Sequence, residues 1–328
     1  MQKKQEVHNE RGINIIFYGI IMLIIIGIII FLGYYIYLNL PRGPKQLQVI
    51  TNPNFEQPVI SEVNQFYPNM KFNHNNIGYS IYSSCDEDKK NRMVQAFKEL
   101  SNKVPLLTFV PLIRSPDIEI SCDENEGQKI DKKHFVAGEG GAKEIIQTGR
   151  YNIVTEGIIL LYENKKIRTK TCDYPNVELH ELLHVLGFDH SEDQRSIMYP
   201  FIESCDQILD QSIIDQLNIM YSEENLPDLY FDKLEVVKKG RYIDFNLTIK
   251  NSGSLKSEEI KLTILDGENI IEEKDMGEIE FGAGVTLTTK NLKLKKLNPD
   301  QIQFIIDKDN IIREIDETNN IGDIKLSE

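Results

Sequence analysis

Residues 180–190 follow the pattern H-E-x-x-H-x-x-G-x-x-H and constrain the local fold of the chain more than any other segment. At about 100° per residue, a helix places His180 and His184 on one face, one turn apart. A helix that continued to His190 would carry that residue about 9 Å further along its axis. Gly187 has no Cβ and can adopt positive φ, so the pattern predicts that the helix ends there and that the chain turns back.

The same three histidines are candidate metal ligands. Neutral imidazoles of His180, His184 and His190 can bind one Zn²⁺ at about 2.0–2.1 Å and leave its fourth position open, as in catalytic zinc sites. A structural zinc normally has four protein ligands, and the cysteines here have no C-x-x-C spacing. By chance, the five fixed positions would occur in on the order of one chain in 10⁵. Three ordinary core or surface histidines are the weaker interpretation.

Glu181 follows the first candidate ligand and has no ligand role in this geometry. Its carboxylate can reach a water molecule in the open metal position. We therefore predict that Glu181 is a general base, which takes a proton from that water and delivers it to a leaving amine. A solvated helix glutamate is the alternative.

Together with Met198, eight residues after His190, the motif resembles the metzincin zinc metalloproteases, and the flanking residues are most similar to the matrixin branch. The resemblance implies an α+β catalytic domain with a mixed twisted sheet plus helices, one catalytic Zn²⁺, and a protein or peptide substrate. It also implies that Met198, in the Met-turn, forms a hydrophobic base under the metal; a core methionine is the alternative. Tyr199 and Pro200 are expected to line the S1′ pocket.

The segments around the motif fit such a domain over residues 75–222. We expect strands at 77–82, 106–113, 117–121 and 157–162, and helices at 86–100 and 210–221. In the family that the chain resembles, the 157–162 strand forms the sheet edge above the cleft, where an extended peptide can bind by strand addition. An acidic residue of the last helix, here Asp215, is expected to brace the Met-turn.

Two further features of this region concern metal binding and control. The segment Gly138-Glu139-Gly140-Gly141, with Asp131 and Glu144, is a candidate loop for Ca²⁺ or a second zinc, and a plain glycine-rich surface loop is the alternative. The P-R-C-G-x-P-D segment, whose cysteine blocks zinc in matrixin zymogens, does not occur in the chain. The sequence therefore gives no explanation of how activity is restrained.

Four cysteines, Cys85, Cys122, Cys172 and Cys205, all lie in the predicted catalytic region. An even number suits two disulfides in an oxidising compartment, and three pairings are possible. The resemblance favours Cys85 with Cys122, because the family sheet brings those strand ends together. Cys172 with Cys205 would join the segments on either side of the predicted helix that carries His180 and His184. Free buried cysteines are the alternative.

Residues 15–38 form an almost unbroken apolar run, long enough for one helix to span a bilayer. No small-residue cleavage site is evident, which favours a retained anchor over a removable signal peptide. Basic residues at 3, 4 and 11 precede the run and others at 42 and 45 follow it, which slightly favours a cytoplasmic N-terminus. We expect a cytoplasmic tail at 1–14, a transmembrane helix at 15–38, a stalk at 39–74, and the remainder outside the cell.

The region 227–328 has no Cys or His and shows short alternating strands separated by turns such as Asn251-Ser252-Gly253. We expect strands at 229–237, 241–250, 259–265, 285–292, 301–306 and 311–315, a pattern typical of a β-sandwich. The region resembles the CARDB modules, which have an immunoglobulin-like fold, through 227–229, 250–253 and the acidic end at 307–320. The resemblance implies a spacer or binding module whose partner is unknown.

The charge of the chain restricts its partners. A net charge of −14 over 328 residues, without a basic patch interleaved with aromatics, argues against a nucleic-acid partner. Two hypotheses of function remain. The first is a membrane-anchored zinc endopeptidase that cleaves extracellular or surface proteins. The alternative is a catalytically inactive zinc-binding surface protein that acts as an adhesion or binding module through its CARDB-like region.

Overall fold

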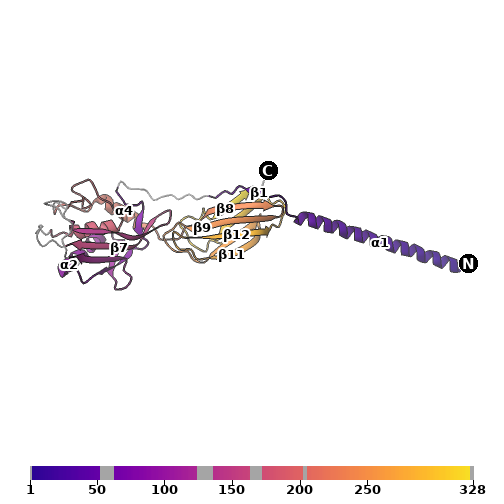
Figure 1. Ribbon diagram of the computed structural model, residues 1–328, viewed down its shortest axis with the longest axis horizontal. Helices are drawn as coiled ribbons and strands as arrows, with labels where there is room; N and C mark the ends of the chain where they lie inside the picture. Colours follow the sequence, from indigo (N-terminus) through magenta and orange to yellow (C-terminus); the bar gives the residue numbers. More distant parts are fainter. Residues whose placement is uncertain (1, 52–62, 124–135, 163–171, 202–204, 326–328) are drawn as a thin grey trace.

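The computed structural model describes residues 2–51, 63–123, 136–162, 172–201 and 205–325. Two folded parts lie end to end, and a long helix extends from one of them (Figure 1). The α/β part, which contains α2, β7 and α4, is at the end far from this helix. The β part, which contains β8, β9, β11 and β12, lies between the α/β part and the helix.

Helix α1 (Gln2–Asn39) contains the predicted apolar run. Its stretch Phe17–Asn39 has 23 residues with a mean hydropathy of 2.7, and none of its most apolar window is buried. At about 1.5 Å per residue, such a stretch reaches across the roughly 30 Å hydrocarbon core of a bilayer. The helix is therefore long and apolar enough to cross a membrane. It begins earlier than the predicted span, since residues 2–14, expected as a tail, are also helical.

A six-stranded sheet forms the centre of the α/β part, in the order β2-β7-β5-β3-β4, with β6 paired to β7. The strands are β2 (Met70–Phe72), β3 (Asn76–Ile81), β4 (Thr108–Pro111), β5 (Ile118–Asp123), β6 (Gly138–Gln147) and β7 (Asn152–Tyr162). β6 is antiparallel to β7, and the other neighbouring strands are parallel. The expected edge strand at 157–162 is wrong: this segment belongs to β7, which lies between β5 and β6. Strand β6 was not predicted, because its start is rich in glycine.

Helix α2 (Glu87–Lys103) begins where the sequence predicts, because Asp86 caps it. The Asp86 side chain accepts a hydrogen bond from the backbone N–H of Lys89 at 2.8 Å, which satisfies one of the free N–H groups of the first turn. The buried residues of α2 repeat at helical spacing and face the sheet: Met93, Ala96, Phe97 and Leu100. Phe97 stacks between Tyr79 of β3 and Phe109 of β4, with ring centroids 4.3 and 4.6 Å away.

Both expected disulfides are present. Cys85, between β3 and α2, is bonded to Cys122 of the neighbouring strand β5. Cys172 is bonded to Cys205, which joins the segment before the motif helix to the segment after the Met-turn. The bonds close loops with sequence separations of 37 and 33 residues. Loops of this length restrict the unfolded chain and thereby stabilise the folded state.

The β part consists of two four-stranded antiparallel sheets, as expected for a sandwich. One sheet contains β1 (Lys45–Leu47), β8 (Leu229–Lys239), β9 (Tyr242–Asn251) and β12 (Gly284–Lys293). The other contains β11 (Asn269–Gly277), β10 (Ile260–Asp266), β13 (Gln301–Ile306) and β14 (Ile321–Lys325). Every second residue of β9 is buried, and Phe245 of β9 meets Phe304 of β13 across the core at 5.1 Å. The strand expected at 311–315 is wrong, and β11 and β14 were not predicted.

Part of the expected stalk belongs to this sandwich. β1 pairs antiparallel with β8, and its Leu47 is buried in the core. Further along, Ile50 exchanges two backbone hydrogen bonds with Asp323. The region 39–74 is therefore not one continuous stalk, because its beginning adds a strand to the sandwich and its end, β2, adds a strand to the α/β sheet.

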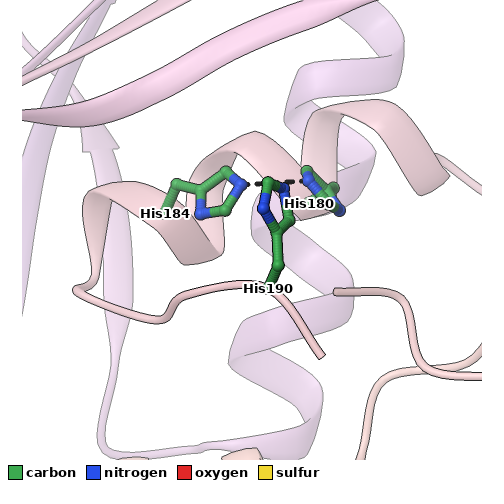
Figure 2. A group of neighbouring side chains, drawn as sticks. All are labelled: His180, His184 and His190. Carbon is green, nitrogen blue, oxygen red and sulfur yellow. Dashed lines mark hydrogen bonds between the residues drawn. The ribbon is translucent and has the colours of Figure 1, made fainter. Parts of the chain in front are cut away.

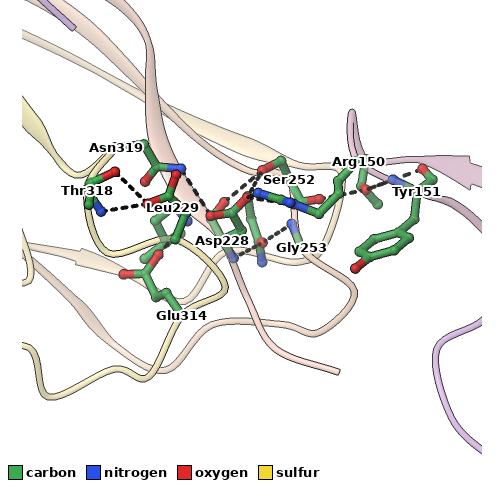
Figure 3. Close-up of polar contacts among 12 residues, drawn as sticks. Arg150, Tyr151, Asp228, Leu229, Ser252, Gly253, Glu314, Thr318 and Asn319 are labelled. Atoms are coloured by element: carbon green, nitrogen blue, oxygen red, sulfur yellow. Dashed lines mark hydrogen bonds and ion pairs between the residues drawn. The ribbon is translucent and has the colours of Figure 1, made fainter. Parts of the chain in front are cut away.

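A buried ion pair connects the two folded parts (Figure 3). Arg150, from the turn between β6 and β7, contacts Asp228, just before β8, at 3.1 Å, and the Asp228 side chain is 0% exposed. Asp228 also accepts hydrogen bonds from Ser252 at 2.6 Å and Asn319 at 3.1 Å. Thr148 adds a hydrogen bond to the carbonyl oxygen of Ser252 at 2.8 Å. The carboxylate of Asp228 thus loses all contact with water and depends on these donors.

We predict that Arg150→Ala destabilises the chain by about 3 kcal/mol, because it leaves a buried charge without its cationic partner. Arg313→Ala is the matched control, since the pair of Arg313 with Glu224 is exposed and should contribute less than about 1 kcal/mol. Urea unfolding of the full chain in detergent measures both free energies. Equal losses from the two variants would show that the buried pair does not hold the two parts together.

Candidate metal centre

Helix α3 (Asn176–Val185) carries the first two histidines of the motif on one face. His180 and His184 are each 6% exposed, and the helix packs against the sheet with Leu179, Leu182 and Leu183 in the core. The helix ends before Gly187, whose φ is +97°. A Cβ on Gly187 would lie 2.7 Å from the Cβ of Met70, so both backbone conformation and space require glycine at this turn.

The turn at Gly187 brings His190 back to the other two histidines. Figure 2 shows the three side chains side by side. The three rings converge with centroid distances of 4.6, 4.8 and 5.3 Å. One nitrogen of each ring lies within 4.8 Å of one nitrogen of each of the others. His190 is exposed, whereas its two partners are buried, so the group is open to solvent on the His190 side.

Backbone carbonyls determine which nitrogens of the two buried histidines are free. Nδ1 of His180 lies 2.6 Å from the carbonyl oxygen of Ile197, and Nδ1 of His184 lies 2.8 Å from that of Phe188. A carbonyl oxygen only accepts hydrogen bonds, so each Nδ1 carries the proton and each Nε2 carries a lone pair. The two Nε2 atoms face one another at 3.0 Å.

Two lone pairs that face one another cannot form a hydrogen bond, and a shared cation satisfies both. A tetrahedral zinc with ligands at about 2.0–2.1 Å holds its ligand nitrogens roughly 3.3 Å apart, close to this separation. Carbonyl groups that orient ligand imidazoles through Nδ1 are also typical of zinc sites. The residues present therefore fit a zinc ion, although the geometry by itself does not identify the metal.

Burial keeps the histidines neutral. Burial and the neighbouring His184 lower the pKa of His180 to about 4. Burial also lowers the pKa of His184, and the charge that His190 carries when protonated adds to this effect. Both imidazoles are therefore in the form that binds a metal at neutral pH.

Glu181 lies under strand β6, with its side chain buried. A Cβ on Gly138 would come within 2.7 Å of the Glu181 side chain, and a Cβ on Gly140 within 2.2 Å of its backbone oxygen. The glycines thus allow β6 to lie directly against helix α3. Burial raises the pKa of the Glu181 carboxyl to about 8, and a hydrogen bond from the backbone N–H of Gly140 opposes this shift.

The segment before β2 holds the third histidine and was not predicted to do so. Gln65 and Phe188 form an antiparallel bridge. Asn64 donates a side-chain hydrogen bond to the carbonyl oxygen of His190 at 3.0 Å. The Phe66 ring lies 5.5 Å from the ring of His184. Asn64 is 126 residues from His190, so no local sequence signal relates the two.

Met198 lies in the core beside the metal helix and is 1% exposed. Its backbone N–H donates to Oγ of Ser196 at 3.0 Å, and that hydroxyl donates to Asp210 at 2.5 Å. Asp210, the N-cap residue of α4 (Gln211–Ser222), therefore braces the Met-turn. The expected brace, Asp215, is wrong, because its carboxylate instead accepts a hydrogen bond from Gln211 of the same helix.

The two candidate pocket residues follow the Met-turn. Tyr199 is half-buried and its ring lies 6.0 Å from that of Phe201, while Pro200 is exposed. An S1′ role for Tyr199 and Pro200 stays a prediction.

At the other end of the site, Arg92 of α2 contacts the start of α3. It donates hydrogen bonds to the carboxylate of Glu178 at 3.0 Å and to the carbonyl oxygen of Cys172 at 2.8 Å.

The predicted calcium or second zinc loop is not a loop. Gly138, Gly140 and Gly141 belong to strand β6, and Glu144 of the same strand accepts a hydrogen bond from Thr155 at 2.9 Å. Asp131, the other candidate ligand, lies outside the described residues. These residues pair with β7 and so gain a structural role that a glycine-rich sequence does not indicate.

Comparisons with known proteins agree with both resemblances. The matrixin family model (Peptidase M10) matches residues 71–221, and the CARDB family model matches residues 226–322. No curated protein matches the chain.

Two similar solved structures each cover 31% of this chain. A crystal structure of a CARDB domain from Pyrococcus furiosus, in complex with di-metal ions, is 16% identical with a TM-score of 0.24; the match covers 31% of this chain and 88% of that chain. A solution structure of a cell surface protein domain from Methanosarcina acetivorans is 17% identical with a TM-score of 0.26, covering 31% of this chain and 94% of that chain. The family matches thus place a segment similar to the matrixin family at residues 71–221, followed by a segment similar to the CARDB family at residues 226–322.

Proposed function

We propose that this chain is a membrane-anchored zinc endopeptidase that cleaves proteins outside the cell. The observation that carries the proposal is the convergence of His180, His184 and His190, with two unprotonated Nε2 atoms 3.0 Å apart and Glu181 beside them. The matrixin match over 71–221 supports the same class of reaction.

Zinc bound by the three imidazoles would act as a Lewis acid toward the substrate carbonyl and would make a water molecule more acidic. Glu181 supplies the proton transfers. Its carboxyl group is buried beside the histidines, and a carboxylate in that place can take a proton and return it. It takes one proton from the attacking water and delivers it to the amine nitrogen of the leaving half, so it ends each cycle unchanged.

Strand β6 is the element best placed to hold the substrate. Among the described residues, β6 pairs with β7 alone, so its other edge has no partner strand, although the N–H of Gly140 donates to Glu181. An extended peptide that added to this edge would lie next to Glu181, which β6 contacts through Gly138 and Gly140. Backbone pairing explains how an endopeptidase grips unfolded segments of varied sequence.

The location follows from α1 and the disulfides. The stretch Phe17–Asn39 is long and apolar enough for a single span, and the two disulfides suit an oxidising compartment outside the cell. We therefore propose that α1 stays in the membrane, with its N-terminal end in the cytoplasm and both folded parts outside.

We predict that Glu181→Gln lowers kcat/KM for an unfolded protein substrate by about 10²–10⁴-fold, because the variant cannot accept the proton of the attacking water. Its zinc content should equal that of the wild type. Glu192→Gln, which changes an exposed carboxylate close to His190, is the control and should cleave normally. Mass spectrometry of bound metal and a fluorescence assay of cleavage measure the two quantities. Bound zinc without chelator-sensitive cleavage by the wild type would instead support the inactive binding protein.

Removal of zinc should lower the thermal stability of the α/β part, because an ion that binds only the folded state stabilises it. At a free zinc concentration of 100 times Kd, the gain is about 2.7 kcal/mol. His184→Ala should be less stable than the zinc-loaded wild type and insensitive to added chelator. Differential scanning calorimetry with and without chelator tests this, and an unchanged wild-type melting temperature would argue against a metal at the three histidines.

We predict that Gly140→Ala lowers kcat/KM by at least about 10²-fold, because its Cβ would come within 2.2 Å of the Glu181 backbone oxygen and displace the base. Gly141→Ala, one residue further along the same strand, meets nothing within 4 Å and should retain activity within about twofold. Both variants are compared by cleavage rate and by melting temperature. Normal cleavage by Gly140→Ala would show that β6 does not position Glu181.

A further inference from the structure

The sandwich end next to helix α1 carries a concentration of basic side chains. We call this group the basic rim; its members are Arg42, Lys45, Lys238, Lys239, Arg241, Lys290, Lys293, Lys295 and Lys296. They come from the connection before β1 and its first residue, from the end of β8 and the β8–β9 turn, and from the end of β12 with the segment after it. The chain as a whole has a net charge of −14, so the rim is opposite in sign to the rest of the molecule.

Contacts along the rim hold its members at one place. Lys45 is the register partner of Lys238 across β1 and β8. Arg241 donates to the carbonyl oxygens of Leu294 and Lys295, which ties the β8–β9 turn to the segment after β12. Burial, and then the charges of Arg42 and Lys45, lower the pKa of Lys238. The basic groups therefore act on one another at close range.

Few acidic groups neutralise the rim. Asp244 pairs with Lys239 and accepts the backbone N–H of Asn291. Asp266 is buried, and its carboxylate accepts the backbone N–H of Lys296 at 2.8 Å. Glu268 and Asp300 are exposed at the same end, on the turns of the other sheet. In the part of the chain that the structure describes, the nine basic groups thus outnumber these four acids, and Arg42, Lys45, Lys290, Lys293, Lys295 and Lys296 are exposed.

The rim lies directly at the point where α1 ends. The β8–β9 turn is so close to that point that a Cβ on Gly240 would be 2.9 Å from the carbonyl oxygen of Leu40 and 3.2 Å from the backbone N of Arg42. The guanidinium of Arg42 lies 5.1 Å from the centre of the Tyr37 ring, in the last turn of α1. Residues 40–44 separate α1 from β1, and fully extended they reach at most about 18 Å.

We propose that the basic rim binds the anionic headgroups of the membrane that α1 crosses, so that the sandwich stands on the bilayer surface. The inference rests on the proposed membrane anchoring. If α1 spans the bilayer, its end at Asn39 lies at the interface, and the short connection keeps the rim within the headgroup layer or close to it. Exposed Lys and Arg side chains at that depth are attracted by anionic lipids and not by zwitterionic ones.

The contact of the basic rim with the membrane determines how far the α/β part lies from the bilayer. β8 and β9 run from the rim to the contact with the α/β part, and a strand of their length spans roughly 33 Å. The α/β part lies at the far end of the sandwich (Figure 1). The metal centre is therefore held away from the membrane, where it reaches surface proteins whose unfolded segments project beyond the headgroups.

The test uses the full chain in two kinds of lipid nanodisc, one of phosphatidylcholine and one of phosphatidylcholine with about 30% phosphatidylglycerol. Lysine acetylation rates are measured by mass spectrometry at low salt. We expect Lys290, Lys293, Lys295 and Lys296 to be modified at least about threefold more slowly in the anionic discs, and to recover their rates in 0.5 M NaCl, since salt screens such contacts. Lys233 and Lys261, exposed on the sandwich away from the rim, are internal controls.

A triple variant, K293Q/K295Q/K296Q, distinguishes contact of the rim with lipid from slower acetylation caused only by the lower pH at an anionic surface. In this variant the remaining Lys290 should regain the rate that it has in zwitterionic discs. K233Q/K250Q/K261Q, which removes the same amount of charge elsewhere on the sandwich, should leave the protection of the rim intact. The melting temperatures of both variants verify that they are folded.

Three outcomes would overturn the inference. Failure of the chain to co-purify with either kind of disc would reject the membrane anchoring and the rim contact together. Co-purification with both discs, but with equal rim labelling in each, would reject the rim contact alone. Protection that appears with added polyglutamate but not with anionic lipid would indicate an acidic protein partner instead.

Discussion

Two imidazole lone pairs that face one another at 3.0 Å in a buried site are the constraint on which the rest of the α/β part depends. The carbonyl oxygens of Ile197 and Phe188 create it, because they hold the Nδ1 protons of His180 and His184. Both carbonyls lie beyond the helix, so the turn at Gly187 and the Met-turn are needed to deliver them. The two carbonyl groups thus fix the tautomers of His180 and His184 and leave each Nε2 with a lone pair that a cation can accept.

The position of Glu181 follows from the absence of side chains on β6. Any Cβ at Gly138 or Gly140 would collide with Glu181 or its backbone, so the strand lies on the helix only where it has glycine. This close approach buries the carboxyl group, which raises its pKa, and supplies the N–H of Gly140 as a donor. One structural feature therefore positions Glu181, raises the pKa of its carboxyl group and brings a strand edge without a partner strand beside it.

Local features of the sequence were predictable, and contacts between distant segments were not. The motif spacing predicts the helix, the turn at Gly187 and the return of His190, and Asp86 predicts the start of α2. The brace on His190 from Asn64, 126 residues away, has no local signal. The segment 311–315 alternates like a strand, but Ile311 is 75% exposed and the N–H of Ile312 bonds to the side chain of Asp307, so no ladder forms there. The glycine-rich segment 138–141 was predicted as a loop, because a strand is recognised from alternating apolar and polar side chains and glycine has none.

The buried ion pair between Arg150 and Asp228 restricts the relative orientation of the two folded parts. An apolar contact of the same size would tolerate sliding, whereas Arg150 and Asp228 interact well only in a narrow range of orientations. Ser252 and Asn319, which belong to the same part as Asp228, complete the donors around the carboxylate. A rotation of one part would remove Arg150 and leave the buried charge of Asp228 without its cation. Strand β1, which follows α1 in the chain, pairs with β8 and thereby fixes the segment after α1 to the sandwich. The fold therefore sets the orientation of the three histidines relative to the sandwich, and residues 40–44 connect β1 of the sandwich to α1.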